Sequence, residues 1–186
     1  IEPDASNASY FFAAAAISGG RVRVDNISID SAQGDIHFVD VLEKMGCTVG
    51  RYADAIEVIG PSTLKAVEVD MKEISDTSLT LAAIAPFAEG PITIRNIEHT
   101  RWQETDRIRA MTTELRKLGV EVVERRDGVT ISPSKISPAA IDTYEDHRMA
   151  MSFSLVGLRA PGIRINNPAC VSKTFPSYFE VLASLP

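Results

Sequence analysis

The sequence contains few of the residues that build disulfides or metal centres. It has two cysteines, Cys47 and Cys170, and three histidines among 186 residues. Their spacing matches no zinc site. Both cysteines stand far apart in apolar, strand-like contexts, which favours reduced thiols and a cytoplasmic protein. We therefore expect neither a metal site nor a disulfide framework.

Long hydrophobic runs and an excess of positive charge are also lacking. No apolar run approaches the roughly 18 residues of a membrane helix, and the longest, residues 10–17, lacks the flanks of a signal peptide. The formal net charge of −6 argues against a nucleic-acid-binding surface. These features predict neither a membrane nor a nucleic-acid partner. Apolar residues make up 45% of the chain, which is sufficient for a packed core.

One pattern occurs three times along the chain. Each copy begins with an aspartate (Asp4, Asp76 and Asp146), continues through an apolar stretch to a glycine, and ends in a strand-like segment with asparagine. Because the aspartates recur about every 70 residues, the pattern predicts repeat units at about residues 1–65, 66–136 and 137–186 of one domain, 1–186. The chain opens with Ile1, not Met, and enters its first motif at once, so we expect a piece of a longer polypeptide.

Each repeat predicts the same order of elements. An aspartate caps an apolar helix, a glycine ends it, and a strand with alternating Val or Ile follows. Since the first helix is apolar nearly all round, it should lie inside, with the sheets outside. Pro86 should shorten this helix near Ala85 in the second unit. Further predicted elements are second helices at 35–45, 105–118 and 174–185, lead-in strands at 67–71 and 140–143, and hairpins of 48–52 with 55–59 and of 121–124 with 129–132, the latter turned by Asp127-Gly128.

Charged residues gather where these predicted helices begin. Gln103-Glu104-Thr105-Asp106-Arg107, Asp146-His147-Arg148 and Lys173-Thr174-Phe175-Pro176 place two arginines and a lysine beside carboxylates. Arginine offers a planar fork and lysine a point charge, a combination suited to a small, multiply charged anion. Neighbouring carboxylates suggest proton transfer as well as binding. The plainer interpretations are an Arg107–Glu104 surface ion pair, a solvated Lys173, and Asp76 as a helix cap.

The same strings resemble the enolpyruvyl transferases, and within them the branch that acts on shikimate 3-phosphate. The matching segments extend in order along the whole chain: Glu2-Pro3-Asp4-Ala5-Ser6, Gln33-Gly34-Asp35, Glu104-Thr105-Asp106-Arg107, Glu114-Leu115-Arg116-Lys117-Leu118-Gly119, Tyr144-Glu145-Asp146-His147-Arg148-Met149-Ala150-Met151 and Lys173-Thr174-Phe175-Pro176. The resemblance implies an α/β (α+β) fold with inner parallel helices and outer mixed four-stranded sheets, an inside-out α/β barrel. It covers the C-terminal domain of a two-domain enzyme, whose N-terminal domain is the implied partner.

The resemblance also implies a reaction and its residues. The carboxyvinyl group of phosphoenolpyruvate would move to the 5-hydroxyl of shikimate 3-phosphate by addition and elimination, without a cofactor. Arg107, Arg148 and Lys173 would bind phosphoenolpyruvate, and Lys173 would also carry protons. Glu104 would protonate the methylene carbon, and Asp76 would serve as base and contact shikimate 3-phosphate. We expect His147 to support this site by hydrogen bonding, and Asp4 and Gln33 to be structural.

The chain departs from the family pattern on the acceptor side. Gln103 occupies the place of a frequent lysine and His99 that of a frequent asparagine. Both are expected to contact shikimate 3-phosphate, and we hypothesise that the lost charge alters the response to anionic inhibitors such as glyphosate. Two alternatives stay open: a transferase with another acceptor, such as a nucleotide sugar, and a non-catalytic fragment that binds a partner half.

Overall fold

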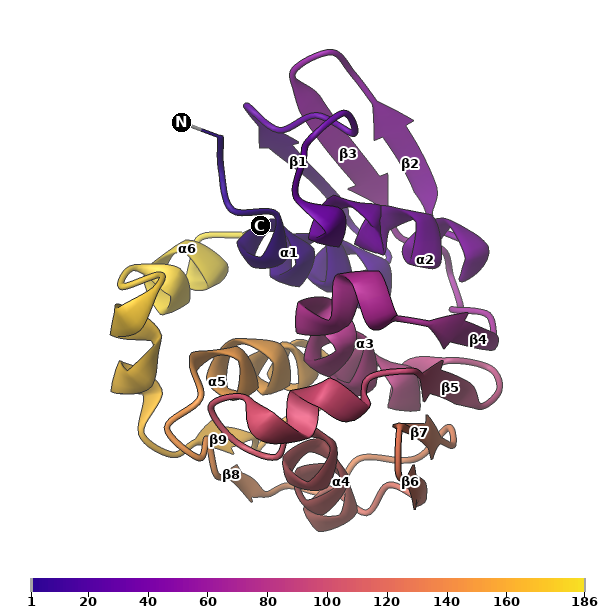
Figure 1. The fold of residues 1–186 in the computed structure, drawn as a ribbon, viewed down its shortest axis with the longest axis vertical. Coiled ribbons are helices and arrows are strands. Elements are labelled where there is room, and N and C mark those ends of the chain that lie inside the picture. The colour runs from indigo at the N-terminus through magenta and orange to yellow at the C-terminus, as the bar shows by residue number, and fades with distance from the viewer. Residues whose placement is uncertain (1, 186) are drawn as a thin grey trace.

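A computed structural model describes residues 2–185 of the chain; Ile1 and Pro186, at the ends of the predicted domain, lie outside the described residues. Three helices lie in the interior and pack side by side: α1 (Ala5–Ser18), α3 (Ser78–Ile84) and α5 (His147–Ser154) (Figure 1). Buried hydroxyls join them, since Ser9 and Thr80 approach to 3.2 Å and Thr80 and Ser152 to 3.3 Å. The predicted inner position of the apolar helices is confirmed.

Three separate sheets surround these helices. The first is antiparallel in the order β1-β3-β2, the second has the order β4-β5-β7-β6 with β4 and β5 parallel, and the third pairs β8 with β9 in parallel. The strands are β1 (Arg21–Asp25), β2 (Thr48–Arg51), β3 (Ala55–Ile59), β4 (Val67–Asp70), β5 (Ile92–Arg95), β6 (Val122–Arg125), β7 (Gly128–Ile131), β8 (Ala140–Ile141) and β9 (Arg164–Ile165). The α/β architecture is confirmed, but only the second sheet has the predicted four strands, and none closes into a barrel within residues 2–185.

Outer helices and short 3-10 helices connect the sheets to the interior. The outer α-helices are α2 (Phe38–Lys44), α4 (Arg107–Lys117) and α6 (Tyr178–Ala183), and the 3-10 helices are η1 (Gly34–His37), η2 (Lys72–Thr77), η3 (Ala85–Phe87), η4 (Glu98–Trp102), η5 (Leu155–Leu158) and η6 (Pro168–Lys173). As predicted, α3 ends just before Pro86 and continues as η3. No helix within residues 2–185 is long and apolar enough to span a bilayer.

The predicted helix 174–185 begins too early. η6 ends at Lys173, and α6 begins at Tyr178, after Pro176. A residue that precedes proline is disfavoured in the helical region, so Phe175 cannot easily continue a helix into Pro176. Cys170 lies in η6, so its predicted strand-like context is also wrong, whereas Cys47 precedes β2; both thiols are free.

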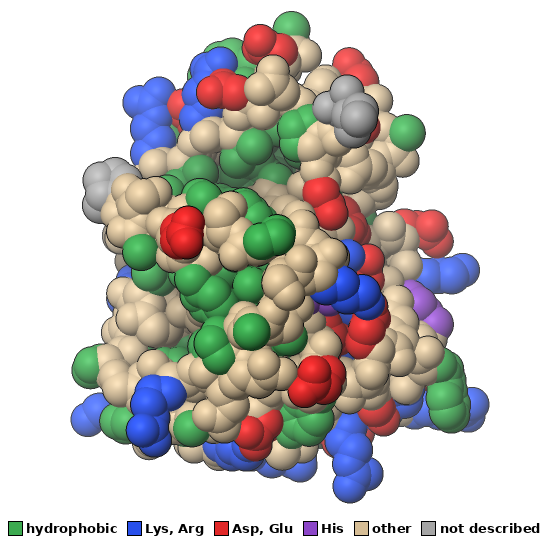
Figure 2. Space-filling view, turned by 90° about the vertical axis from the view of Figure 1, so that its left-hand side faces the viewer, with side chains coloured by type: hydrophobic (Ala, Val, Ile, Leu, Met, Phe, Trp, Pro, Cys, Tyr) green, Lys and Arg blue, Asp and Glu red, His purple; other side chains and the backbone are tan. Residues whose placement is uncertain are grey.

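Apolar side chains gather in the middle of the face that carries α6 (Figure 2). A hollow there lies between α1 and the last helical segments and is lined mainly by Ala14, Ala15, Val22, Leu158, Leu182 and Leu185.

Both predicted hairpins form, β2 with β3 and β6 with β7. The turn of the second hairpin lies one residue earlier than predicted, at Arg126 and Asp127, because Gly128 already belongs to β7 and pairs with Arg125. Gly128 passes so close to β5 that an added Cβ would lie 1.9 Å from the carbonyl oxygen of Ile94. The glycine is therefore needed for the close approach of two backbones.

Gly128→Ala is expected to lower the free energy of unfolding by about 1–3 kcal/mol, because backbone atoms of β5 must move to admit the methyl group. Urea denaturation measures the change. Gly157→Ala is the matched control, since its Cβ would meet only Ile163 at 3.8 Å. Equal stabilities of the two variants would contradict the steric explanation.

Candidate active site

Asp76 connects two arginines from different helices. Its Oδ1 accepts a hydrogen bond from Arg107 Nη1 at 2.9 Å, and its Oδ2 accepts one from Arg148 Nη2 at 2.8 Å. Asp76 lies in η2, and α3 begins after Thr77 without a side-chain cap, so the interpretation of Asp76 as a helix cap is wrong. Charge-assisted bonds from two guanidinium groups replace the weaker bond to a backbone N–H. The carboxylate is thus held between both cations.

Arg107 is the most deeply buried cation of this cluster. Its side chain is 2% exposed, and its Nε donates to Asp146 Oδ2 at 2.8 Å. Its remaining donors contact Asp76, Glu104 and the Gln103 side-chain oxygen. The Arg107–Glu104 ion pair predicted from their spacing therefore exists, but it joins an exposed glutamate to a buried arginine that also binds other side chains. An anionic ligand would have to compete with these carboxylates for the guanidinium group.

Asp146 both caps a helix and binds Arg107. Its Oδ1 accepts from the backbone N–H of Arg148 at 2.8 Å, as predicted for the cap of α5, while its Oδ2 holds Arg107. Asp4 caps α1 through Asn7 N at 3.0 Å without such a second partner. For both residues the repeat pattern predicted a helix cap, but it did not predict the bond between Asp146 and Arg107. No local pattern around Asp146 indicates this bond, because Arg107 lies 39 residues away in the chain.

Glu104 lies between two cations. Lys173 Nζ donates to its Oε1 and Arg107 Nη2 to its Oε2, each at 3.0 Å. The hydrogen bond from Lys173, together with the charge of Arg107, lowers the pKa of Glu104 to about 2 against the opposing effect of partial burial. Glu104 is thus a carboxylate here, whereas proton donation calls for a position away from cations. Lys173 itself is 61% exposed, so a ligand can reach its ammonium group.

Lys173→Met is expected to raise the pKa of Glu104 from about 2 toward its ordinary 4.5. Because the folded pKa is depressed, the ion pair stabilises the fold above pH 4.5, and this contribution is lost as the pH falls toward 2. The carboxyl ¹³C shift of Glu104, followed by NMR through a pH titration, measures the midpoint. Lys135→Met, in the loop after β7, is the control that should leave it unchanged. An unchanged midpoint in Lys173→Met would show that Lys173 does not set this pKa.

His147 does not make the hydrogen bond predicted for it. The side chain is 5% exposed, yet its Nδ1 has no hydrogen-bond partner among the described residues and lies 3.9 Å from Asp146 Oδ1. Burial, aided by the positive charge of Arg148, lowers the pKa of His147, so the ring is neutral at pH 7. The ring is therefore packed beside the charged groups and does not orient them.

The two residues predicted on the acceptor side lie at the edge of this network. His99 is exposed, and its Nε2 lies 2.8 Å from the Ser75 hydroxyl, next to Asp76. Gln103 is exposed as a residue while its oxygen accepts from Arg107. Both can therefore contact a ligand that also reaches Asp76.

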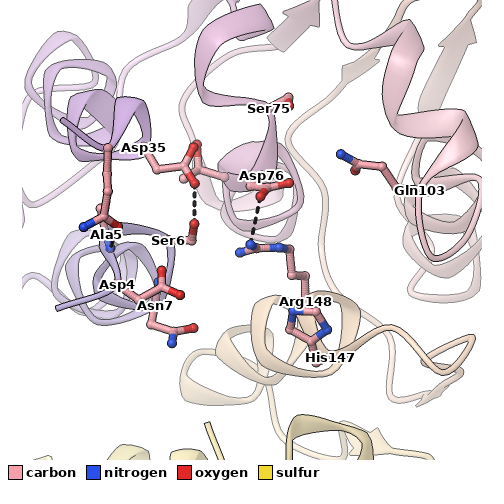
Figure 3. A network of polar contacts seen from close by, with 12 residues as sticks. Asp4, Ala5, Ser6, Asn7, Asp35, Ser75, Asp76, Gln103, His147 and Arg148 are labelled. Carbon is pink, nitrogen blue, oxygen red and sulfur yellow. Dashed lines mark hydrogen bonds and ion pairs between the residues drawn. The ribbon is translucent and has the colours of Figure 1, made fainter. Parts of the chain in front are cut away.

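Asp35 is a further acidic group that our interpretation of the sequence did not single out. It lies in η1, accepts a hydrogen bond from the Ser6 hydroxyl, and faces the same space as Asp76 and Arg148 (Figure 3). Burial raises the pKa of Asp35, although Ser6 opposes the shift. The nearby Gln33 accepts from Ala5 N and donates to the Pro3 carbonyl, both at 2.8 Å, so it has the expected structural role at the start of α1. The signal for Asp35 was its place in the Gln33-Gly34-Asp35 string.

Comparison with known proteins agrees with the motif resemblance. The sequence profile of the family described as EPSP synthase (3-phosphoshikimate 1-carboxyvinyltransferase) matches residues 1–182. The chain belongs to the EPSP synthase family. A 3-phosphoshikimate 1-carboxyvinyltransferase from Nostoc sp. (strain PCC 7120) is 60% identical over 96% of this chain, and one from Colwellia psychrerythraea is 54% identical over 100% of it.

Solved structures of the EPSP synthase family have the same fold. EPSP synthase from Acinetobacter baumannii superposes with a TM-score of 0.88 at 28% identity, over 98% of this chain and 46% of that one. The enolpyruvyl transferase NikO from Streptomyces tendae, with a TM-score of 0.77 at 24% identity, shares the fold over 100% of this chain and 43% of its own. The chain spans 42% of the length of the Nostoc relative. Within residues 2–185, no group of three or more His, Cys, Asp or Glu side chains is arranged to hold a metal ion.

Proposed function

We propose that this chain supplies the C-terminal half of the active site of a 3-phosphoshikimate 1-carboxyvinyltransferase. The observation that carries the proposal is the convergence of Arg107, Arg148 and Lys173 on Asp76 and Glu104, from segments far apart in the chain. Three cations around two carboxylates suit a substrate with a carboxylate and a phosphate. The reaction moves the carboxyvinyl group of phosphoenolpyruvate to the 5-hydroxyl of shikimate 3-phosphate and releases phosphate.

The anion competes with the protein carboxylates for their cations. Arg107 and Arg148 present guanidinium forks, and exposed Lys173 adds a point charge. When the phosphoenolpyruvate anion draws Lys173 away, Glu104 loses the contact that depresses its pKa most. Its proton affinity then rises, as protonation of the methylene carbon demands. Binding of phosphoenolpyruvate thus raises the pKa of Glu104 and makes it a better proton donor.

Asp76 acts as the base for the acceptor hydroxyl. It takes the proton as the hydroxyl oxygen bonds to C2 of phosphoenolpyruvate, while Glu104 gives a proton to C3. Elimination then returns the proton from C3 to Glu104, and phosphate leaves as the C–O bond breaks and takes up the proton that Asp76 accepted. His99 and Gln103 lie beside Asp76 and contact the acceptor. No cofactor takes part in these steps.

The remaining half of the enzyme supplies the other wall of the site. The chain spans only 42% of its Nostoc relative, so a second half of comparable size acts as its partner. Closure of two halves around the substrates excludes water and brings the reacting groups together. The two free thiols, Cys47 and Cys170, support a place in the reducing cytoplasm.

Phosphate release from phosphoenolpyruvate and shikimate 3-phosphate tests the proposal. The chain is assayed alone and as a two-half enzyme, which is its mixture with the part of the Nostoc relative that it does not match. We expect turnover only after mixing, and its loss in Lys173→Met. If both pieces are folded by circular dichroism and associate but give no turnover, the proposal fails. If the parent mixture gives no turnover and Lys173→Met leaves the association of the two halves intact, the result favours a non-catalytic partner-binding fragment.

A further inference from the structure

The segment before α5 contains two consecutive left-handed residues that are not glycine. Tyr144 has φ of 55° and Glu145 has φ of 59°, directly before Asp146. Side chains with a Cβ rarely adopt this region, so two in succession need support from their surroundings. Strained backbone of this kind is often found where a site must be held in one geometry. The contacts of these two side chains supply the support.

The Tyr144 side chain is held by a buried carboxylate of α4. Its hydroxyl donates to Glu114 Oε1 at 2.6 Å, and the backbone N–H of Asp142 donates to Glu114 Oε2 at 3.0 Å. Glu114 is 0% exposed, and Lys117 Nζ at 2.9 Å balances its charge. The proximity of Glu114, after the effect of burial, raises the pKa of Tyr144 to about 12, so the phenol keeps its proton.

Two residues on one face of α4 therefore bind the segment before α5. Arg107 and Glu114 are seven residues apart, two helical turns, and so lie on the same side of the helix. Arg107 holds Asp146, and Glu114 holds Tyr144. The start of α5 cannot shift along or away from α4 while both contacts exist.

The Glu145 side chain extends the support to the segment that carries Lys173. Asn167 Nδ2 donates to Glu145 Oε1 at 2.9 Å, and Asn167 is itself left-handed with φ of 49°. η6 begins at the next residue and ends at Lys173. The turn at Tyr144 and Glu145 thus contacts α4, which carries Arg107, and the start of the η6 segment, which carries Lys173. It also leads directly into α5, which carries Arg148.

We propose that Glu114 and Tyr144 are positioning residues for anion binding: they hold the turn at Tyr144 and Glu145, and the turn fixes Arg148 and Lys173 relative to Arg107. The ligand is a small, multiply charged anion that carries a carboxylate and a phosphate. This rests on the proposed function for the identity of the anion as phosphoenolpyruvate. Neither residue touches the reacting atoms.

The test compares Tyr144→Phe and Glu114→Gln with the parent in the two-half enzyme. We expect KM for phosphoenolpyruvate to rise about tenfold or more, because small displacements of binding groups weaken a rigid anion site strongly. KM for shikimate 3-phosphate should change less than threefold. Tyr52→Phe is the matched control: Tyr52 is 45% exposed and stacks with Arg23 in the first sheet, so it should behave as the parent.

Amide hydrogen exchange gives a second readout that does not need activity. In Tyr144→Phe, the amides of residues 146–150 should exchange faster, while those of α1 keep the parent's rates. Unchanged exchange would overturn the proposal, as would an unchanged KM for phosphoenolpyruvate. Equal rises in KM for both substrates, together with faster amide exchange throughout the protein, would mean a merely structural role and would also overturn the proposal. If the parent has no turnover, the proposed function has failed, and exchange together with phosphoenolpyruvate binding decides the inference.

Discussion

Arg107→Ala is expected to lower the free energy of unfolding by about 3–5 kcal/mol, as is typical when one partner of a buried ion pair is removed. Arg107 is 2% exposed, and Asp146, its partner at 2.8 Å, is 0% exposed. Without the guanidinium group, Asp146 becomes a buried carboxylate with only backbone N–H support from α5. Glu104 and Asp76 lose a cation at the same time. Urea denaturation, followed by circular dichroism, measures the loss.

Two further variants make this expectation specific. Arg126→Ala removes a pair with Glu98 whose arginine is 85% exposed, so its effect should stay within about 1 kcal/mol. Arg107→Lys keeps the charge but cannot reach Asp146, Asp76 and Glu104 together, so an intermediate loss is expected. If Arg107→Ala were as stable as Arg126→Ala, the buried network would not stabilise the fold.

The repeats predicted the inner helices and most of the outer strands, because periodicity and capping are local properties. Asp4 and Asp146 cap α1 and α5 as their positions indicated. Asp76 has the same repeat position but does not cap, since two arginines from distant segments bind it. That outcome depends on tertiary contacts across 31 and 72 residues, which no local pattern contains.

The same distinction applies to the candidate site. Motifs identified the residues that come together, and the i,i+3 spacing predicted the Arg107–Glu104 pair. The spacing could not show that Arg107 is buried or that Lys173 neutralises Glu104. Nor could it show the unpartnered Nδ1 of His147, because burial and partners are set by how α4, α5 and η6 meet.

Asp76→Asn is expected to lower kcat of the two-half enzyme by about 10²–10⁴, the usual contribution of a general base. An amide cannot take the hydroxyl proton. It also turns N–H groups toward one of the two guanidinium groups that Asp76 now bridges at 2.9 and 2.8 Å, so KM for phosphoenolpyruvate should rise as well. Steady-state phosphate release, with each substrate varied in turn, measures both effects.

Asp4→Asn is the matched control, because Asp4 occupies the same position in the first repeat. Asparagine caps helices as well as aspartate does, and Asp4 contacts Asn7 N but no arginine of the network. Its kcat should stay within about twofold of the parent, since no cation or proton transfer depends on it. Equal kcat values for Asp76→Asn and the parent would exclude Asp76 as the base. Equal losses of kcat in both variants would assign the effect to the repeat position that the two aspartates share. The two arginines that only Asp76 contacts would then not explain it.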